Sequence, residues 1–183
     1  MRVSLKTKII GLLLGLALAP ILKAADKFVT FNQEGGTLAL TTTQQPNFSI
    51  LCADEEHKGV LMAVRNLQED FFRVTNTRPY LKIGAKKQVD EGAQKLRILI
   101  GSFDKSPLIK QLVKAKKLDV RELKGRNEKF IITTVTNPIE GVEGEVLLIA
   151  GSDKRGTIYG IYELSCQIGI SPWYWWADVP VMK

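Results

Sequence analysis

The stretch that decides the fold is Val146-Leu-Leu-Ile-Ala-Gly151-Ser-Asp-Lys-Arg-Gly156-Thr-Ile-Tyr159. Its first half is a short apolar run of the kind found in buried strands, and its second half continues with apolar residues at helical spacing. Polar residues and two glycines separate the halves, so we expect the chain to pass here from a sheet into a helix. Gly169 stands where the end of that helix favours a glycine.

Strands and helices are expected to alternate along the rest of the chain. Val60, Val64, Leu67 and Phe71 form one apolar helical stripe, and Asp54-Glu55-Glu56 is interpreted as its N-cap and first turn. Pro107 is expected at the first position of a second helix. Strands are predicted at 28–31, 37–41, 48–52, 80–83, 96–100, 129–135 and 145–150, the first two as a hairpin around Gly35-Gly36. The fold class is therefore α+β or α/β, a mixed sheet covered by about three helices.

The first 25 residues are expected to be a secretory signal peptide. Arg2, Lys6 and Lys8 precede an apolar run, 9–22, and small residues follow at Ala24-Ala25. A membrane anchor is the alternative, but the run is shorter than the ~20 residues of a spanning helix. We therefore expect an exported protein, in the periplasm or outside the cell, with no membrane attachment after cleavage.

The charge balance gives no reason to expect a nucleic-acid partner. The 183 residues have a net charge of +7, and the leader contains four of the 26 basic residues, which leaves +3 for the remainder. The group Lys110, Lys114, Lys116 and Lys117 is most simply a solvated helix face. The remainder is expected to comprise one domain, 26–170, and a Trp-rich connector, 171–183.

The two cysteines and the single histidine do not indicate a metal site. Cys52 and Cys166 can form a disulfide in an exported protein or remain two buried thiols, and the sequence leaves both open. There is no CxxC motif, and His57 has no other histidine as a partner. We expect neither a metal nor a cofactor.

The loop after the last predicted strand resembles a phosphate-binding loop only in part. It follows a strand and opens a helix, but Thr157 and Ile158 stand where the Lys and the Ser or Thr of that motif belong. Free N–H groups at the helix start, with Ser152, Asp153, Lys154 and Arg155, are candidates for binding a carboxylate or other anion. The alternative is that Ser152 or Asp153 caps the helix while the two cations face water.

All three tryptophans lie within Trp173-Tyr-Trp175-Trp176, near the end of the chain. Trp173 and Trp175 are candidates for stacking on sugar rings. With aromatic residues on both faces of an extended segment, burial against a neighbouring domain is the commoner outcome. No nucleophile–base pair or carboxylate pair can be shown to converge, so no catalytic residue is assigned.

The stretch from Gly151 to Ser165, continued by Ile168-Gly-Ile-Ser-Pro-Trp-Tyr-Trp-Trp-Ala-Asp-Val-Pro180, resembles the N-terminal region of glycoside hydrolase family 115. These are secreted xylan α-1,2-glucuronidases, which remove glucuronic acid or its 4-O-methyl form from xylan. The resemblance implies a small α/β domain like the one before the barrel in hexosaminidase-type glycosidases. It also implies a following (β/α)₈ barrel that holds the catalytic carboxylates.

Three hypotheses follow for the function of this chain. The first is a non-catalytic N-terminal domain or fragment, inactive alone, whose partners are the catalytic barrel and glucuronoxylan or aldouronic acids. The second is a stand-alone carbohydrate-binding module that uses Trp173, Tyr174 and Trp175 as stacking platforms. The third is a periplasmic scaffold domain.

Overall fold

The computed structural model describes residues 28–31, 38–40, 48–84 and 95–171. Five strands and three helices lie within these ranges. In chain order they are β1 (Ser49–Cys52), α1 (Lys58–Thr75), β2 (Tyr80–Ile83), β3 (Leu96–Ser102), α2 (Pro107–Lys114), β4 (Phe130–Thr136), β5 (Glu145–Gly151) and α3 (Lys154–Gln167). The strands form one sheet in the order β2-β1-β3-β5-β4. Only β4 runs antiparallel to its neighbour, so the predicted mixed α+β sheet is confirmed.

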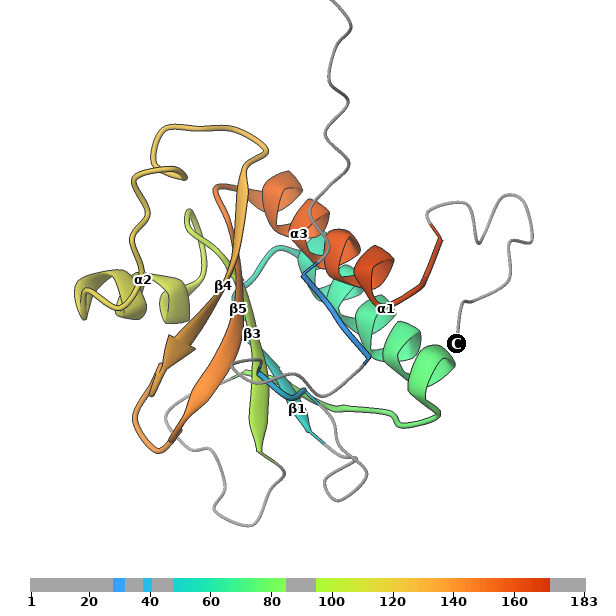
Figure 1. Ribbon diagram of the computed structural model, residues 1–183. Coiled ribbons are helices and arrows are strands. Elements are labelled where there is room, and N and C mark those ends of the chain that lie inside the picture. The colour runs from blue at the N-terminus through green and yellow to red at the C-terminus, as the bar shows by residue number, and fades with distance from the viewer. Residues whose placement is uncertain (1–27, 32–37, 41–47, 85–94, 172–183) are drawn as a thin grey trace, which may run out of the picture.

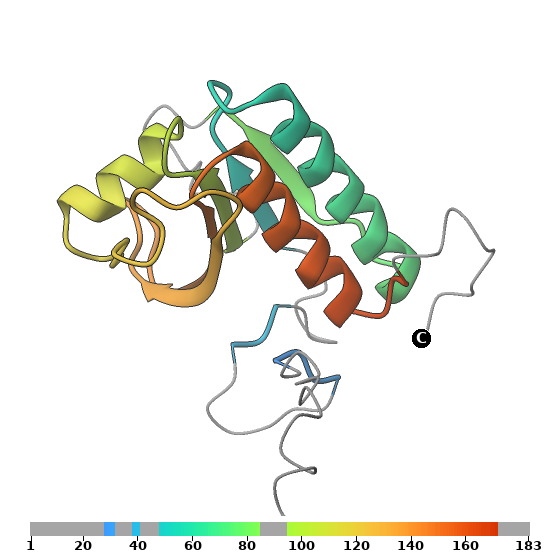
Figure 2. The same ribbon diagram turned by 90° about the horizontal axis from the view of Figure 1, so that it is seen from above.

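The helices cover both faces of the sheet (Figures 1 and 2). On one face α1 and α3 lie side by side, and α2 lies on the other. Strand β5 contributes side chains to the cores on both faces of the sheet, because successive side chains of a strand point to opposite faces. Ile149 belongs to the core under α1 and α3, whereas Leu148 and Ala150 belong to the core under α2.

Helix α1 has the apolar stripe that the sequence predicts, but its cap differs. Val60, Val64, Leu67 and Phe71 are all buried under it. The prediction that residues 54–56 form the N-cap and first turn was wrong: the helix begins at Lys58, and His57 at the cap position makes no side-chain capping bond. The physical reason is that the carboxylate of Glu56 is bound elsewhere in the protein.

The ends of the other two helices follow the predictions more closely. Pro107 opens α2, and the Ser106 side chain accepts a hydrogen bond from Ile109 N over 3.4 Å. Beyond α3, Gly169 has a φ of 110°, which favours glycine. Its N–H donates to Cys166 O, and Ile170 N donates to Ser165 O, both over 3.0 Å, which is the Schellman arrangement.

The predicted N-terminal hairpin is not seen in the described residues. Residues 28–31 and 38–40 have no strand conformation. Val29 and Leu40 instead pack, partly buried, against the core under α1 and α3. Alternating apolar residues indicate that one side of a short segment is buried. Packing against this core buries that side without any strand pairing.

The two cysteines are free thiols, Cys52 buried and Cys166 exposed. The predicted leader, Trp173 and Trp175 lie outside the described residues, and so does the connector apart from Ser171. In the part of the chain that the structure describes, no helix is both long and apolar enough to cross a membrane.

Candidate functional site at the carboxyl edge of the sheet

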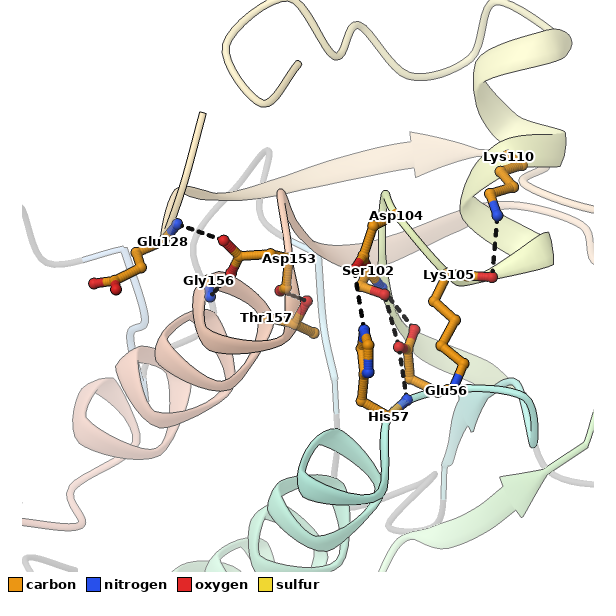
Figure 3. Close-up of polar contacts among 10 residues, drawn as sticks. All are labelled: Glu56, His57, Ser102, Asp104, Lys105, Lys110, Glu128, Asp153, Gly156 and Thr157. Carbon is orange, nitrogen blue, oxygen red and sulfur yellow. Dashed lines mark hydrogen bonds and ion pairs between the residues drawn. The ribbon is translucent and has the colours of Figure 1, made fainter. Parts of the chain in front are cut away.

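The parallel strands β1, β3 and β5 end at one edge of the sheet. The helix after β1 lies on one face and the helix after β3 on the other, although the two strands are neighbours. Open α/β sheets usually bind ligands at the point where the helices after two adjacent parallel strands lie on opposite faces of the sheet. Polar side chains from both loops meet at this point (Figure 3).

Glu56, in the loop after β1, is a buried carboxylate that is fully engaged by its neighbours. Its side chain accepts hydrogen bonds from Ser102 N and from Ser102 Oγ, each over 2.7 Å, and from His57 N over 2.9 Å. Glu56 is 3% exposed and Ser102 is fully buried. The carboxylate therefore joins the loop after β1 to the end of β3.

The thiol of Cys52 lies close enough to respond to that carboxylate. Burial of the thiol, reinforced by the negative charge of Glu56, raises the pKa of Cys52 to about 12. Both effects disfavour a thiolate, which is the nucleophilic form of cysteine. Cys52 is therefore a packing residue of the core at this edge.

His57 and Asp104 form a more open pair beside Glu56. His57 Nε2 lies 3.0 Å from Asp104 Oδ2, and the two side chains are 28% and 45% exposed. Partial burial of the carboxylate acts to raise the pKa of Asp104, but the Ser102 and His57 side chains lower it by more, so the net shift is downward. The ionised form of Asp104 is therefore favoured.

The four residues from Ser152 to Arg155 that the sequence singled out lie in the loop after β5 and in the first turn of α3. Asp153 accepts hydrogen bonds from Gly156 N over 2.8 Å and from Glu128 N over 2.9 Å, and so caps α3. Desolvation acts to raise the pKa of Asp153, but the backbone N–H groups of Gly156, Glu128 and Arg155 outweigh it, so the pKa is lowered. The helix-cap alternative describes this geometry.

The residues next to Asp153 differ in exposure to solvent. Ser152 is buried, and its hydroxyl accepts a hydrogen bond from Lys129 N over 3.1 Å. Lys154 and Arg155 are exposed, and Arg155 Nη1 forms an ion pair with Glu128 over 2.7 Å. The structure thus brings these residues to the same edge as Glu56 and His57. Their binding of a substrate carboxylate stays a prediction.

The glycines of this loop are explained by close packing. A Cβ on Gly151 would meet Thr157 N at 2.1 Å, and one on Gly156 would meet Lys129 O at 2.2 Å. A Cβ on Gly160, one turn further along α3, would meet Ile149 Cγ2 at 2.8 Å. The spacing that resembles a phosphate loop therefore lets α3 approach β4 and β5.

Sequence reasoning missed the contacts among Glu56, His57, Ser102 and Asp104. One signal pointed toward them: 97–105 and 147–154 share a strand followed by Gly-Ser and then Asp-Lys. In the structure β3 and β5 are parallel neighbours, with Ser102 beside Gly151. The repeated segments lie side by side, but the first one meets the loop after β1, which no local pattern reveals.

The chemistry available at this edge is limited by burial. Glu56 and Ser102 are buried and bonded to each other, and His57 with Asp104 remains as a partly exposed hydrogen-bonded pair. Among the described residues there is no group of three His, Cys, Asp or Glu side chains that could hold a metal ion. In the described residues this edge is a set of polar contacts that joins the ends of β1 and β3, with His57 and Asp104 as its more exposed pair.

Comparison with solved structures gives an informative likeness. Neither a protein-family model nor a curated protein matches the chain. A solved structure described as a family GH115 4-O-methyl-alpha-glucuronidase, BtGH115A, with specificity for decorated arabinogalactans is similar, with a TM-score of 0.53 and 29% sequence identity. The likeness covers 74% of this chain and 15% of that enzyme.

This chain therefore resembles a fold region of a GH115 glucuronidase and spans only a small part of that enzyme's length. A second solved structure, CpGH84D, has a TM-score of 0.44 and 10% identity over 67% of this chain and 17% of its own. A likeness that weak carries no argument.

Proposed function

We propose that this chain acts as a non-catalytic N-terminal domain of an exported glycoside hydrolase that removes glucuronic acid or 4-O-methylglucuronic acid from a polysaccharide. The observation that carries the proposal is the 29% identity to a GH115 glucuronidase over 74% of this chain. Because the match occupies 15% of that enzyme, its activity belongs to a much larger molecule.

The carboxylates at the carboxyl edge support a non-catalytic role. Glycoside hydrolysis usually needs two carboxyl groups on opposite sides of the scissile bond. Glu56 is buried under three hydrogen bonds, and Asp153 is the cap of α3. Both are committed to holding the fold together, so we expect the catalytic carboxylates to come from another domain.

The outer surface of the α1/α3 pair supports docking onto such a domain. Met62 is 64% exposed, Tyr159 is 39% exposed and Tyr162 is 45% exposed. Tyr162 also accepts a hydrogen bond from Asn66 Nδ2 over 3.0 Å, which ties the outer sides of α3 and α1 together. Exposed apolar side chains gathered on two adjacent helices are typical of an interaction surface.

The substrate class is a glycan with glucuronic acid branches. The resemblance read from the sequence points to xylan, whereas the structural neighbour is described as specific for decorated arabinogalactans. The proposal therefore commits to the glucuronosyl group and leaves the backbone polysaccharide to experiment. Lys154 and Arg155, exposed at the start of α3, are the described residues proposed to approach its carboxylate.

The test begins with the coding sequence after Lys183 and continues with the protein. We expect the reading frame to continue into a barrel-coding region. The 183-residue chain alone should release no glucuronic acid from glucuronoxylan or from arabinogalactan, whereas the longer protein should. Release by the 183-residue chain, or a stop codon followed by unrelated genes, would contradict the proposal.

A variant test then addresses the docking surface in the longer protein. Met62→Ser with Tyr162→Ser should lower its thermal unfolding temperature and its activity. Glu140→Ser, at an exposed position between β4 and β5, is the control and should change neither. Equal behaviour of the two variants would remove the α1/α3 surface from the proposal.

A further inference from the structure

The positive charge of this protein is concentrated in one short segment. Residues 105–129 contain nine Lys or Arg and three Asp or Glu, a net +6, whereas all residues after the predicted leader sum to +3. Helix α2 and the connection from α2 to β4 make up most of the segment. We name this segment the lysine surface.

The fold directs these cations to the solvent. Leu108, Ile109 and Leu112 of α2 are buried in the core on that face of the sheet, together with Leu118 and Leu123 of the connection. Because these apolar residues are buried in the core, the polar residues between them in the sequence face the solvent. All seven lysines of the segment are exposed: Lys129, next to β4, and the six before it, Lys105, Lys110, Lys114, Lys116, Lys117 and Lys124.

The acids of the segment do not neutralise these lysines. Asp119 pairs with Arg121 over 2.6 Å, and Glu128 pairs with Arg155 over 2.7 Å. Lys110 Nζ donates to Lys105 O over 3.4 Å, and Lys117 Nζ donates to Asn137 O, and both acceptors are neutral carbonyls. None of the seven lysines has a carboxylate partner among the described residues.

We propose that the lysine surface binds acidic polysaccharide through the carboxylates of its uronic acid residues. Exposed ammonium groups without carboxylate partners attract a polyanion at long range, and lysine suits this because it acts as a point charge on a flexible stem. The inference deepens the proposed function, since a glucuronidase works on a polymer with such carboxylates. The lysine surface holds the polymer near the enzyme, on the face of the sheet opposite the α1/α3 docking surface.

The composition of the surface favours polysaccharide over nucleic acid. Residues 105–129 contain no Phe, Tyr or Trp. Proteins that bind single-stranded nucleic acid combine cations with aromatic side chains on which bases stack. The lysine surface provides the charge without the stacking partners.

The test compares two forms of one polymer on the full chain. Binding is measured by isothermal titration with glucuronoxylan and with carboxyl-reduced glucuronoxylan, which differs only in its carboxylates. We expect binding to the first alone, weakening as NaCl rises from about 50 to about 300 mM because salt screens exposed charges. Equal binding to both forms, no binding to either, or tighter binding to duplex DNA at the same salt would overturn the proposal.

Three double variants distinguish a localised binding surface from an effect of net charge. Lys110→Glu with Lys114→Glu should weaken binding about tenfold, since two attractive contacts become repulsive. Lys58→Glu with Arg65→Glu makes the same charge change on exposed positions of α1, across the sheet, and should weaken binding by less than about twofold. Lys110→Gln with Lys114→Gln should give an intermediate loss. Equal losses in the two Glu pairs would show a net-charge effect and refute a localised surface.

The result of the polysaccharide-binding experiment is independent of the test of the proposed function. Loss of polysaccharide binding in the lysine variants does not depend on the reading frame after Lys183. Conversely, a chain that binds no glucuronoxylan still satisfies the proposed function if the longer protein releases glucuronic acid.

Discussion

Glu56 and Ser102 lie 46 positions apart in the sequence, yet the Glu56 carboxylate accepts both the N–H and the hydroxyl of Ser102 over 2.7 Å. The contact closes the gap between the ends of β1 and β3, where the following helices depart to opposite faces of the sheet. A carboxylate of the protein thus occupies the position where many open α/β sheets bind a ligand.

Removal of that carboxylate is predicted to destabilise the protein. Glu56→Ala leaves the buried N–H and hydroxyl of Ser102 without an acceptor, which costs about 3 kcal/mol in the free energy of unfolding. The measurement is urea denaturation followed by circular dichroism. The exposed neighbour provides the control, and Glu55→Ala should change stability by less than about 0.5 kcal/mol. A loss in Glu56→Ala no larger than the control's would show that the buried contact contributes nothing.

Two glycine-to-alanine substitutions are predicted to have opposite effects. Gly156→Ala places a methyl group 2.2 Å from Lys129 O, a backbone atom, so α3 must move and about 3 kcal/mol of stability is lost. Gly59→Ala on α1 places its methyl group 3.4 Å from Ile158 Cδ1, an ordinary contact. Alanine favours a helix over glycine, so this variant should gain up to about 1 kcal/mol. The measurement is the denaturant midpoint of unfolding of each variant and of the unchanged protein. Shifts in the same direction in both variants would contradict the prediction of opposite effects.

Asp70 is predicted to make stability depend on pH in the opposite sense to a paired surface carboxylate. Burial raises the pKa of Asp70, while Ser165 and Arg73 lower it by less, and the residue is 4% exposed. The folded state therefore binds a proton more readily than the unfolded state. This group contributes most stability below its unfolded pKa of about 3.9, and the contribution is lost as pH rises through the raised folded pKa.

The measurement is the stability of the native protein minus that of Asp70→Asn at several pH values. This difference should fall as the pH rises, because the variant has no proton to lose at this position. Subtraction also removes Asp104 and Asp153, whose lowered pKa values give the opposite slope. A difference that is flat or rises with pH would contradict the assignment.

The two cysteines are predicted to react at very different rates. Cys52 is fully buried with a pKa of about 12, so almost no thiolate forms near neutral pH. Cys166 is exposed, and its partial burial, with the negative charge of Glu163, raises its pKa and so slows its reaction. Ellman's reagent at about pH 8 should therefore detect one thiol in the native protein and both after unfolding. Cys166→Ser should abolish the native signal, and a native signal that remained would mean that Cys52 is accessible.

Local pattern predicted most of the fold because the described elements depend on short-range periodicity. The stripe from Val60 to Phe71 repeats every three or four residues, and the strand ending at Gly151 is a short apolar run, so each was predicted with small errors at its ends. The two N-terminal strands were predicted wrongly because the apolar residues Val29 and Leu40 record burial against the core under α1 and α3 and do not specify a strand partner, while the predicted turn at Gly35-Gly36 lies outside the described residues. The predicted N-cap of α1 was wrong because an acidic residue before a helix can also bind a distant group, as Glu56 binds Ser102.

By itself the sequence determined the mixed α+β architecture, the order of the elements from β1 to α3, and the glycine that follows α3. Those features depend on neighbours within a few positions of each other, so the amino-acid pattern contains them. The tertiary structure alone decided that Glu56 and His57 meet Ser102 and Asp104, and that the glycines of 151–160 serve close packing. It also placed the lysine surface on the face opposite α1 and α3. Such contacts join residues far apart in the chain, and they are fixed only when the strands pair and the two cores form.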